Sequence, residues 1–379
     1  MGIRDQEWWS QRQWLHPLTA IIMRAIIAAK GLGIPGRQEA LTNVRASRFY
    51  GNIVNPQSDV FPLYDTLSWM AQSKEDDKFE QLVQRIDHRS KLLRTWELKA
   101  GVSAQVTALE IDRPDGLTQR LVVRRHGDAD LKQNPNIASD EFRLLQILRA
   151  AGVAAPTPCY LDQSGEIFPR PYVVLEYIEG EPEFAPTNLP DFLLQLAAHL
   201  SRVHAVDCSN LDLAFLPEQE KMCAERLRER PAKMDEELGE GRIRAALEAV
   251  WPLPQRNRPV LLHGDFWPGN ALWKDGQLVA VIDWEDAQIG DPLADLANSR
   301  LEILWAFGIE AMHSFTHNYA SQATIDFTDL PYWDLCAALR HASKSDEWAT
   351  YVTNEETMRR GYSLFIAHAF EKISVLENR

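Results

Sequence analysis

One polar loop between two apolar segments constrains the fold of this chain more than any other feature. Leu261-Leu262 is followed by His263-Gly264-Asp265-Phe266-Trp267-Pro268-Gly269-Asn270, and a second apolar run, Leu278 to Ile282, ends in Asp283. Ala271-Leu272-Trp273 and the turn Lys274-Asp275-Gly276 precede this second run, which predicts a β-hairpin that returns the chain beside its start. We therefore expect Asp265, Asn270 and Asp283 to lie around one small volume. Two carboxylates and an amide carbonyl are hard oxygen ligands that suit Mg²⁺.

The length of 379 residues is typical of two lobes or domains rather than one. The chain carries 40 Lys and Arg against 54 Asp and Glu, and this net charge of −14 argues against a nucleic-acid-binding surface. All of the net charge falls in residues 181–379, which hold 32 acidic and 18 basic side chains. Such a region attracts a cationic small molecule, although the same composition also serves solubility.

Cysteine usage and hydropathy bear on the compartment. Cys159, Cys208, Cys223 and Cys336 are scattered and fit no zinc pattern, which is typical of a reducing compartment such as the cytoplasm. No stretch reaches the roughly 18 apolar residues that a membrane-spanning helix needs. We expect a cytoplasmic protein with no membrane partner.

The pattern along the chain divides it into three regions. Residues 1–90 are expected to form a helical extension whose role the sequence does not reveal, with a turn-rich break at 52–59 and helical spacing at 77–86. Residues 91–180 favour a small antiparallel lobe in the order β-β-α-β, with strands at 102–111, 121–125 and 172–177 and a helix at 139–151. Residues 181–379 are predicted to be mostly helical, with a β-rich insert at 260–284.

The motif His-x-Asp-x₄-Asn followed by Ile-Asp-Trp resembles the catalytic and metal-binding loops of the aminoglycoside phosphotransferase family, the kinase-like group that includes choline kinase. The resemblance covers about residues 95–370 and is strongest at 261–297. It implies an α+β, protein-kinase-like fold with a small antiparallel β N-lobe and a larger, mostly helical C-lobe, here with an added N-terminal helical region. It also implies a Mg²⁺-dependent kinase that uses ATP or GTP.

The resemblance assigns roles to the residues of the motif. Asp265 is implied as the base that accepts the proton of the acceptor hydroxyl, and His263 as the residue that orients the loop. Asn270 and Asp283 are implied as the magnesium ligands. Asp291 and Asp295 follow the metal loop at the start of a helix, and we interpret both as structural supports. His204 is interpreted as a packed, hydrogen-bonded histidine.

The nucleotide would bind the first lobe. Gly101 and Ser103 belong to a segment that resembles the phosphate-covering loop of the family. Arg124 aligns with the lysine that contacts phosphate in kinases, and its neighbour Arg125 remains an alternative because adjacent strand residues face opposite sides. Glu141 is the implied partner of that cation. Glu176 and Ile178 belong to the linker between the lobes, and their backbone groups would contact the adenine of the nucleotide.

We therefore expect transfer of a γ-phosphoryl group to a hydroxyl of a small, neutral or cationic acceptor. One alternative is a catalytically weak, nucleotide-binding regulatory protein of the same fold, since arginine replaces lysine and the phosphate loop contains a single glycine. A protein kinase is the other alternative. The absence of an arginine after His263, and of Asp-Phe-Gly and Ala-Pro-Glu segments, argues against it.

Overall fold

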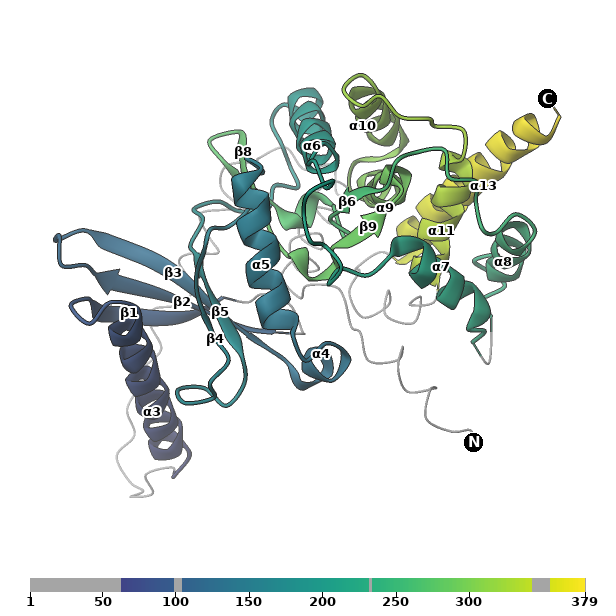
Figure 1. The fold of residues 1–379 in the computed structure, drawn as a ribbon. Helices are drawn as coiled ribbons and strands as arrows, with labels where there is room; N and C mark the ends of the chain where they lie inside the picture. Colours follow the sequence, from purple (N-terminus) through teal and green to yellow (C-terminus); the bar gives the residue numbers. More distant parts are fainter. Residues whose placement is uncertain (1–62, 99–103, 232–233, 343–354, 379) are drawn as a thin grey trace, which may run out of the picture.

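The computed structural model describes residues 63–98, 104–231, 234–342 and 355–378, with the side chains of 63–74, 129 and 355 left undescribed. A five-stranded antiparallel sheet forms the first lobe, and a helical second lobe follows it (Figure 1). The sheet order is β1-β2-β3-β5-β4, with β1 at Lys91–Leu98, β2 at Ala104–Asp112, β3 at Thr118–His126, β4 at Pro158–Asp162 and β5 at Tyr172–Glu176. This architecture confirms the expected protein-kinase-like fold.

Two helices cover opposite faces of the sheet, and the alternation of strand residues decides which side chain meets which helix. Tyr172 and Val174 of β5 share a core with Phe79 and Leu82 of α3 (Leu63–Ile86). Their neighbours, such as Val173, belong instead to the core that contains α5 (Ile137–Ala150). Figure 1 shows α5 between the sheet and the second lobe. The short α4 (Asp128–Gln133) precedes α5.

The predicted order β-β-α-β was wrong, because the lobe contains two more strands and a further short helix. The missed strands, β1 and β4, are the two edges of the sheet. β1 is largely exposed and carries a bulge between Leu92 and Arg94, so it lacks a regular alternation. β4 has only five residues. The predicted helical spacing at 77–86 is confirmed as the end of α3, whereas the expected break at 52–59 lies outside the described residues.

The second lobe is built on helices packed around two small two-stranded sheets. The helices are α6 (Leu189–His204), α7 (Gln219–Arg228), α8 (Glu240–Glu248), α9 (Pro292–Phe307), α10 (Ile309–Ala320), α11 (Leu330–Ala342) and α13 (Glu355–Glu377). The antiparallel pairs are β6 (Val260–Leu262) with β9 (Gln288–Gly290) and β7 (Ala271–Lys274) with β8 (Gln277–Val281). Two short 3₁₀ turns, Pro268–Asn270 and Trp284–Asp286, follow the two polar loops. Within the described part of the chain, no helix is both long and apolar enough to cross a membrane.

Candidate active site

The loop after β6 is held by the first turn of α9. The Asp295 carboxylate accepts hydrogen bonds from the backbone N–H groups of His263, at 2.6 Å, and Gly264, at 2.8 Å. His204 Nε2 lies 3.2 Å from the same carboxylate. Burial acts to raise the pKa of Asp295, but these hydrogen bonds outweigh it and hold the pKa below its ordinary value. Asp291 caps α9 through the Leu293 N–H at 2.9 Å, with Pro292 at the first helical position, as expected.

Any residue other than glycine at position 264 would require the neighbouring backbone to move. The φ of Gly264, 80°, lies in the left-handed region, and a Cβ built there would lie 1.9 Å from the Asp286 carbonyl oxygen. The loop after β6 and the loop after β8 therefore touch through backbone at this point. This contact explains why a glycine stands where protein kinases carry an arginine.

His263 ties the two loops together from inside. Its Nε2–H donates to the Ile282 carbonyl at 3.0 Å, and its Nδ1 accepts from the Asp265 N–H at 3.2 Å. The ring is fully buried and lies 4.4 Å, centroid to centroid, from the ring of Trp284. These contacts suit the predicted orienting role and leave His263 no access to a ligand.

Asp265 and Asn270 contact each other directly. The Asn270 Nδ2 donates to the Asp265 backbone carbonyl at 3.0 Å and to its Oδ2 at 3.3 Å. With its amide nitrogen used in this way, Asn270 offers its carbonyl oxygen to a ligand. Burial raises the pKa of Asp265, Arg340 opposes the rise, and nearby Asp286 adds to it.

Asp283 follows β8 and returns to the same volume, as the predicted hairpin requires. Its backbone φ is 68°, in a left-handed region that aspartate tolerates better than most residues. The backbone N–H of the preceding Ile282 donates to the backbone carbonyl of Asn270 at 2.8 Å, and this hydrogen bond joins the two loops. The side chain of Asp283 is 27% exposed, so a ligand can reach its carboxylate.

The donor set fits a magnesium ion that is shared with phosphate. Among the described residues no group of three His, Cys, Asp or Glu is arranged to hold a metal. Mg²⁺, however, is usually bound by one or two protein oxygens together with water and substrate phosphates. The Asp283 carboxylate and the Asn270 carbonyl oxygen supply that number.

Arg124 reaches the site from β3 and joins the lobes. Its guanidinium lies 3.0 Å from Glu141 of α5 and 3.0 Å from Asp283, and it also contacts Glu285. Burial acts to lower the pKa of Arg124, but these carboxylates outweigh it and raise that pKa well above its ordinary value. Burial also raises the pKa of Glu285. Arg124 thus faces the loop after β8 and contacts Glu141, as the sequence suggested.

Arg125 faces the other side of the sheet. It pairs with Glu75 of α3 at 2.7 Å, and its guanidinium lies 4.7 Å from the centre of the Phe168 ring. The alternation of side chains along β3 therefore separates the two arginines, and only Arg124 points toward Asp283.

The remaining predicted nucleotide contacts are less defined. Gly101 and Ser103 lie outside the described residues. Glu176 ends β5, and its backbone N–H donates to the Thr157 carbonyl at 2.8 Å, so that donor is already used. The linker that contains Ile178 then crosses to the second lobe. There Gly180 passes so close to β7 and β8 that a Cβ would lie 3.0 Å from Val279.

Sequence reasoning did not identify Arg340 or Glu302 as site residues. Arg340, near the end of α11, contacts the Gly264 carbonyl and lies 3.2 Å from Asp265 Oδ1 and from Asp286 Oδ2. Glu302 of α9 lies 3.5 Å from His341, and burial together with the nearby Asp265 raises its pKa to about 8. Arg340 is far from the motif in sequence, whereas Glu302 lies shortly after its end at residue 297, and no local pattern marks either residue.

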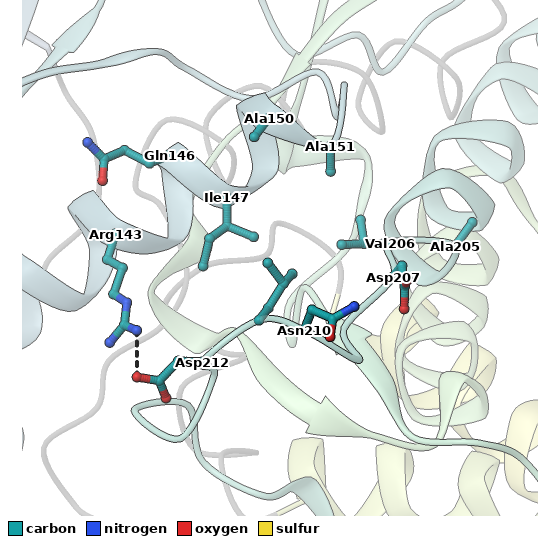
Figure 2. A pocket seen from close by; sticks show the side chains of 11 residues that line it. Arg143, Gln146, Ile147, Ala150, Ala151, Ala205, Val206, Asp207, Asn210 and Asp212 are labelled. Carbon is teal, nitrogen blue, oxygen red and sulfur yellow. Dashed lines mark hydrogen bonds and ion pairs between the residues drawn. The ribbon is translucent and has the colours of Figure 1, made fainter.

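A cavity of about 680 Å³ lies elsewhere, between α5 and the segment after α6. Figure 2 shows residues of α5, including Arg143 and Ile147, facing the loop that carries Asn210 and Asp212. The Arg143–Asp212 ion pair, 2.7 Å long, spans the two sides. None of the predicted site residues lines this cavity.

Comparison with known proteins yields related sequences. Acyl-CoA dehydrogenase family member 10 of Mus musculus is 28% identical over 48% of this chain and 18% of its own length. Member 11 of Rattus norvegicus is 24% identical over 67% of this chain and 35% of its own length. The chain therefore spans about a fifth to a third of these curated relatives. Viomycin phosphotransferase of Streptomyces vinaceus is 33% identical over 34% of this chain and 48% of its own length.

Solved structures share the fold at low identity. A crystal structure described as a putative aminoglycoside phosphotransferase from Ralstonia eutropha has a TM-score of 0.58 and 15% identity, over 78% of this chain and 98% of that one. Spectinomycin phosphotransferase in complex with ADP and spectinomycin has a TM-score of 0.53 and 14% identity, over the same shares. The model of a family described as "Phosphotransferase enzyme family" matches residues 96–336. With the motif, the fold and this match in agreement, the chain belongs to the phosphotransferase enzyme family.

Proposed function

We propose that this protein transfers the γ-phosphoryl group of ATP or GTP to a hydroxyl of a small molecule, in the manner of the aminoglycoside phosphotransferases. One observation carries the proposal. Asp265, Asn270 and Asp283 meet at one hairpin, and Arg124 of the opposite lobe lies 3.0 Å from Asp283. This is the arrangement of a base, two metal ligands and a phosphate-binding cation that phosphoryl transfer needs.

Each side chain has a defined task in this proposal. Asp265 orients the acceptor hydroxyl and accepts its proton as the new O–P bond forms, while the bond from the γ-phosphorus to the β,γ-bridging oxygen breaks and ADP or GDP leaves. Asn270 and Asp283 hold Mg²⁺, which when bound neutralises charge on the donor phosphates. Arg124 contacts the phosphates from the first lobe and is kept in place by Glu141. His263 keeps the two loops in register from the core.

The nucleotide and the acceptor are proposed from two lines of support. Related structures are described as complexes with GDP and kanamycin or with ADP and spectinomycin, so nucleotides and small alcohols suit this fold. The acidic excess in residues 181–379 favours a neutral or cationic acceptor. An amine-bearing acceptor should show a Michaelis constant that rises with salt, because salt screens exposed charges over about 8 Å at physiological ionic strength.

A screen of hydroxyl-bearing compounds tests the proposal. Formation of ADP or GDP is measured with Mg²⁺, and ³¹P NMR identifies the phosphorylated product. The expected result is acceptor-dependent product formation that Asp265→Asn abolishes while nucleotide affinity is kept. Tight nucleotide binding without turnover of any acceptor would favour the regulatory alternative. Preference for a carboxylate- or phosphate-bearing alcohol would contradict the proposed acceptor charge.

A further inference from the structure

The guanidinium of Arg340, on α11, connects the loop after β6 with the loop after β8. Arg340 lies 75 residues after Asp265, near the end of α11. Its Nη1 donates to the Gly264 carbonyl, and its Nη2 donates to Asp265 Oδ1 and Asp286 Oδ2, each at 3.2 Å. It therefore contacts both the loop after β6 and the loop after β8.

These contacts hold the Asp265 carboxylate at both of its oxygens. Oδ1 accepts from Arg340, and Oδ2 accepts from the Asn270 amide at 3.3 Å. Rotation of an aspartate carboxylate about its last torsion is otherwise broad. Two donors on separate elements narrow it and leave the carboxylate in one orientation.

The backbone before Asp265 is held in the same way. The Gly264 N–H donates to Asp295 of α9 at 2.8 Å, and its carbonyl accepts from Arg340 of α11. Polar groups on both sides of the Gly264 residue thus bind neighbouring helices of the second lobe. A side chain at position 264 itself could not do this, because a Cβ there would collide with the Asp286 carbonyl.

The element that carries Arg340 is firmly packed. Arg300 of α9 makes two hydrogen bonds to Asp334 of α11, at 2.9 and 3.0 Å, and both side chains are buried. α11 also packs against α8 and α13. A guanidinium on a rigid helix is suited to orienting a carboxylate, since its planar fork is fixed in direction.

We propose that Arg340 is a positioning residue, which orients Asp265 toward the acceptor hydroxyl and keeps the catalytic loop in register with the loop that carries Asp283. This inference rests on the proposed phosphoryl transfer. The cation that orients Asp265 therefore comes from α11, far along the chain, because position 264 has no room for a cationic side chain. Arg340 contacts Gly264 and Asp265 on the side of the proposed base, so its loss should lower turnover more than nucleotide affinity.

The test compares Arg340→Ala and Arg340→Lys with the parent, and uses Arg300→Ala and Arg300→Lys as matched controls on the same helix pair. We expect Arg340→Ala to lower kcat about 10²-fold, as expected for a misplaced catalytic group, with little change in the Michaelis constant for the nucleotide. Lysine should recover only part of the rate because a point charge cannot reproduce the fork. Guanidinium chloride at a non-denaturing concentration should restore turnover of Arg340→Ala beyond the effect of an equal concentration of sodium chloride.

The Arg300 variants should lose thermal stability but lower kcat far less than Arg340→Ala does, because Arg300 contacts Asp334 and Thr316 rather than the two polar loops. Guanidinium should not rescue them. Turnover of Arg340→Ala within threefold of the parent would overturn the inference. A loss that guanidinium does not restore, or one that the Arg300 variants share, would also overturn it and leave a structural role. A parent that transfers no phosphoryl group would refute the proposed function itself, whereas an active parent and an equally active Arg340→Ala would refute only the role of Arg340.

Discussion

Replacing Arg124 by alanine should weaken nucleotide binding much more than the same change at Arg125. Arg124 contacts Asp283 of the second lobe, whereas Arg125 packs on α3 beside Glu75 and Phe168. Charge-assisted hydrogen bonds contribute about 1.5–3 kcal/mol each, so the loss of one to phosphate corresponds to roughly 10- to 150-fold in Kd. Arg125→Ala removes contacts on the α3 side of the sheet and should leave Kd within about twofold.

The two variants should also differ in stability. Arg124→Ala leaves the carboxylates of Glu141, Asp283 and Glu285 without their shared cation, and breaking a buried pair costs about 3–5 kcal/mol. The pair between Arg125 and Glu75 involves a carboxylate that is 47% exposed, and such a pair contributes about 0–1 kcal/mol. The cation–π contact with Phe168 adds about 0.5–1 kcal/mol.

Calorimetric titration with ATP and GTP in the presence of Mg²⁺ measures the difference, and urea unfolding measures the stability of each variant. Arg124→Lys is the second variant, since it keeps the charge and folds if alanine does not. Lysine should bind nucleotide more tightly than alanine at this position. If Arg125→Ala lost more nucleotide affinity than Arg124→Ala, the phosphate contact would belong to Arg125. The conclusion that the Arg124 face of β3 binds the nucleotide would then be refuted.

Three further changes test the site. Asp265→Asn should lower kcat by about 10²–10⁴-fold with nucleotide affinity unchanged, and turnover at the parent rate would exclude Asp265 as the base. Asp283→Ala should abolish the enhancement of ATP binding by Mg²⁺, measured calorimetrically with and without the ion; an equal enhancement in both proteins would contradict its role as a ligand. Glu302 has a pKa of about 8 in the folded protein, above the ordinary value, so its contribution to stability is full below about pH 4 and is lost as the pH rises toward 8. Glu302→Gln should therefore gain up to about 3 kcal/mol relative to the parent in urea unfolding at pH 7, but much less at pH 5, and a gain independent of pH would refute the raised pKa.

The arrangement of the candidate site was predictable from the sequence because its parts are local. Asp265 and Asn270 precede, and Asp283 follows, one hairpin whose turn and apolar strands are visible in the sequence and are observed as β7 and β8. The helix cap at Asp291 and the packed His204 followed from equally short-range patterns and are confirmed. The acceptor, the metal and the phosphate loop at Gly101 and Ser103 remain predictions.

Other features depended on contacts between distant segments. β1 and β4 were missed because edge strands are half exposed and need no regular alternation. The boundary proposed at residue 90 separates α3 from the sheet, yet Phe79 and Leu82 of α3 share a core with β5. No local periodicity in α3 reveals which surface its apolar side chains cover.

The sequence by itself determined the hairpin and the polar side chains at its two ends, since short turns and strand periodicity act over a few residues. Only the tertiary structure decided between Arg124 and Arg125, because the choice depends on which face of β3 meets α5 and which meets α3. Only the packing of α9 and α11 brought Asp295 and Arg340 to the two sides of Gly264. Long-range pairing of this kind is set by the burial of whole helices, so no local motif marks a residue such as Arg340.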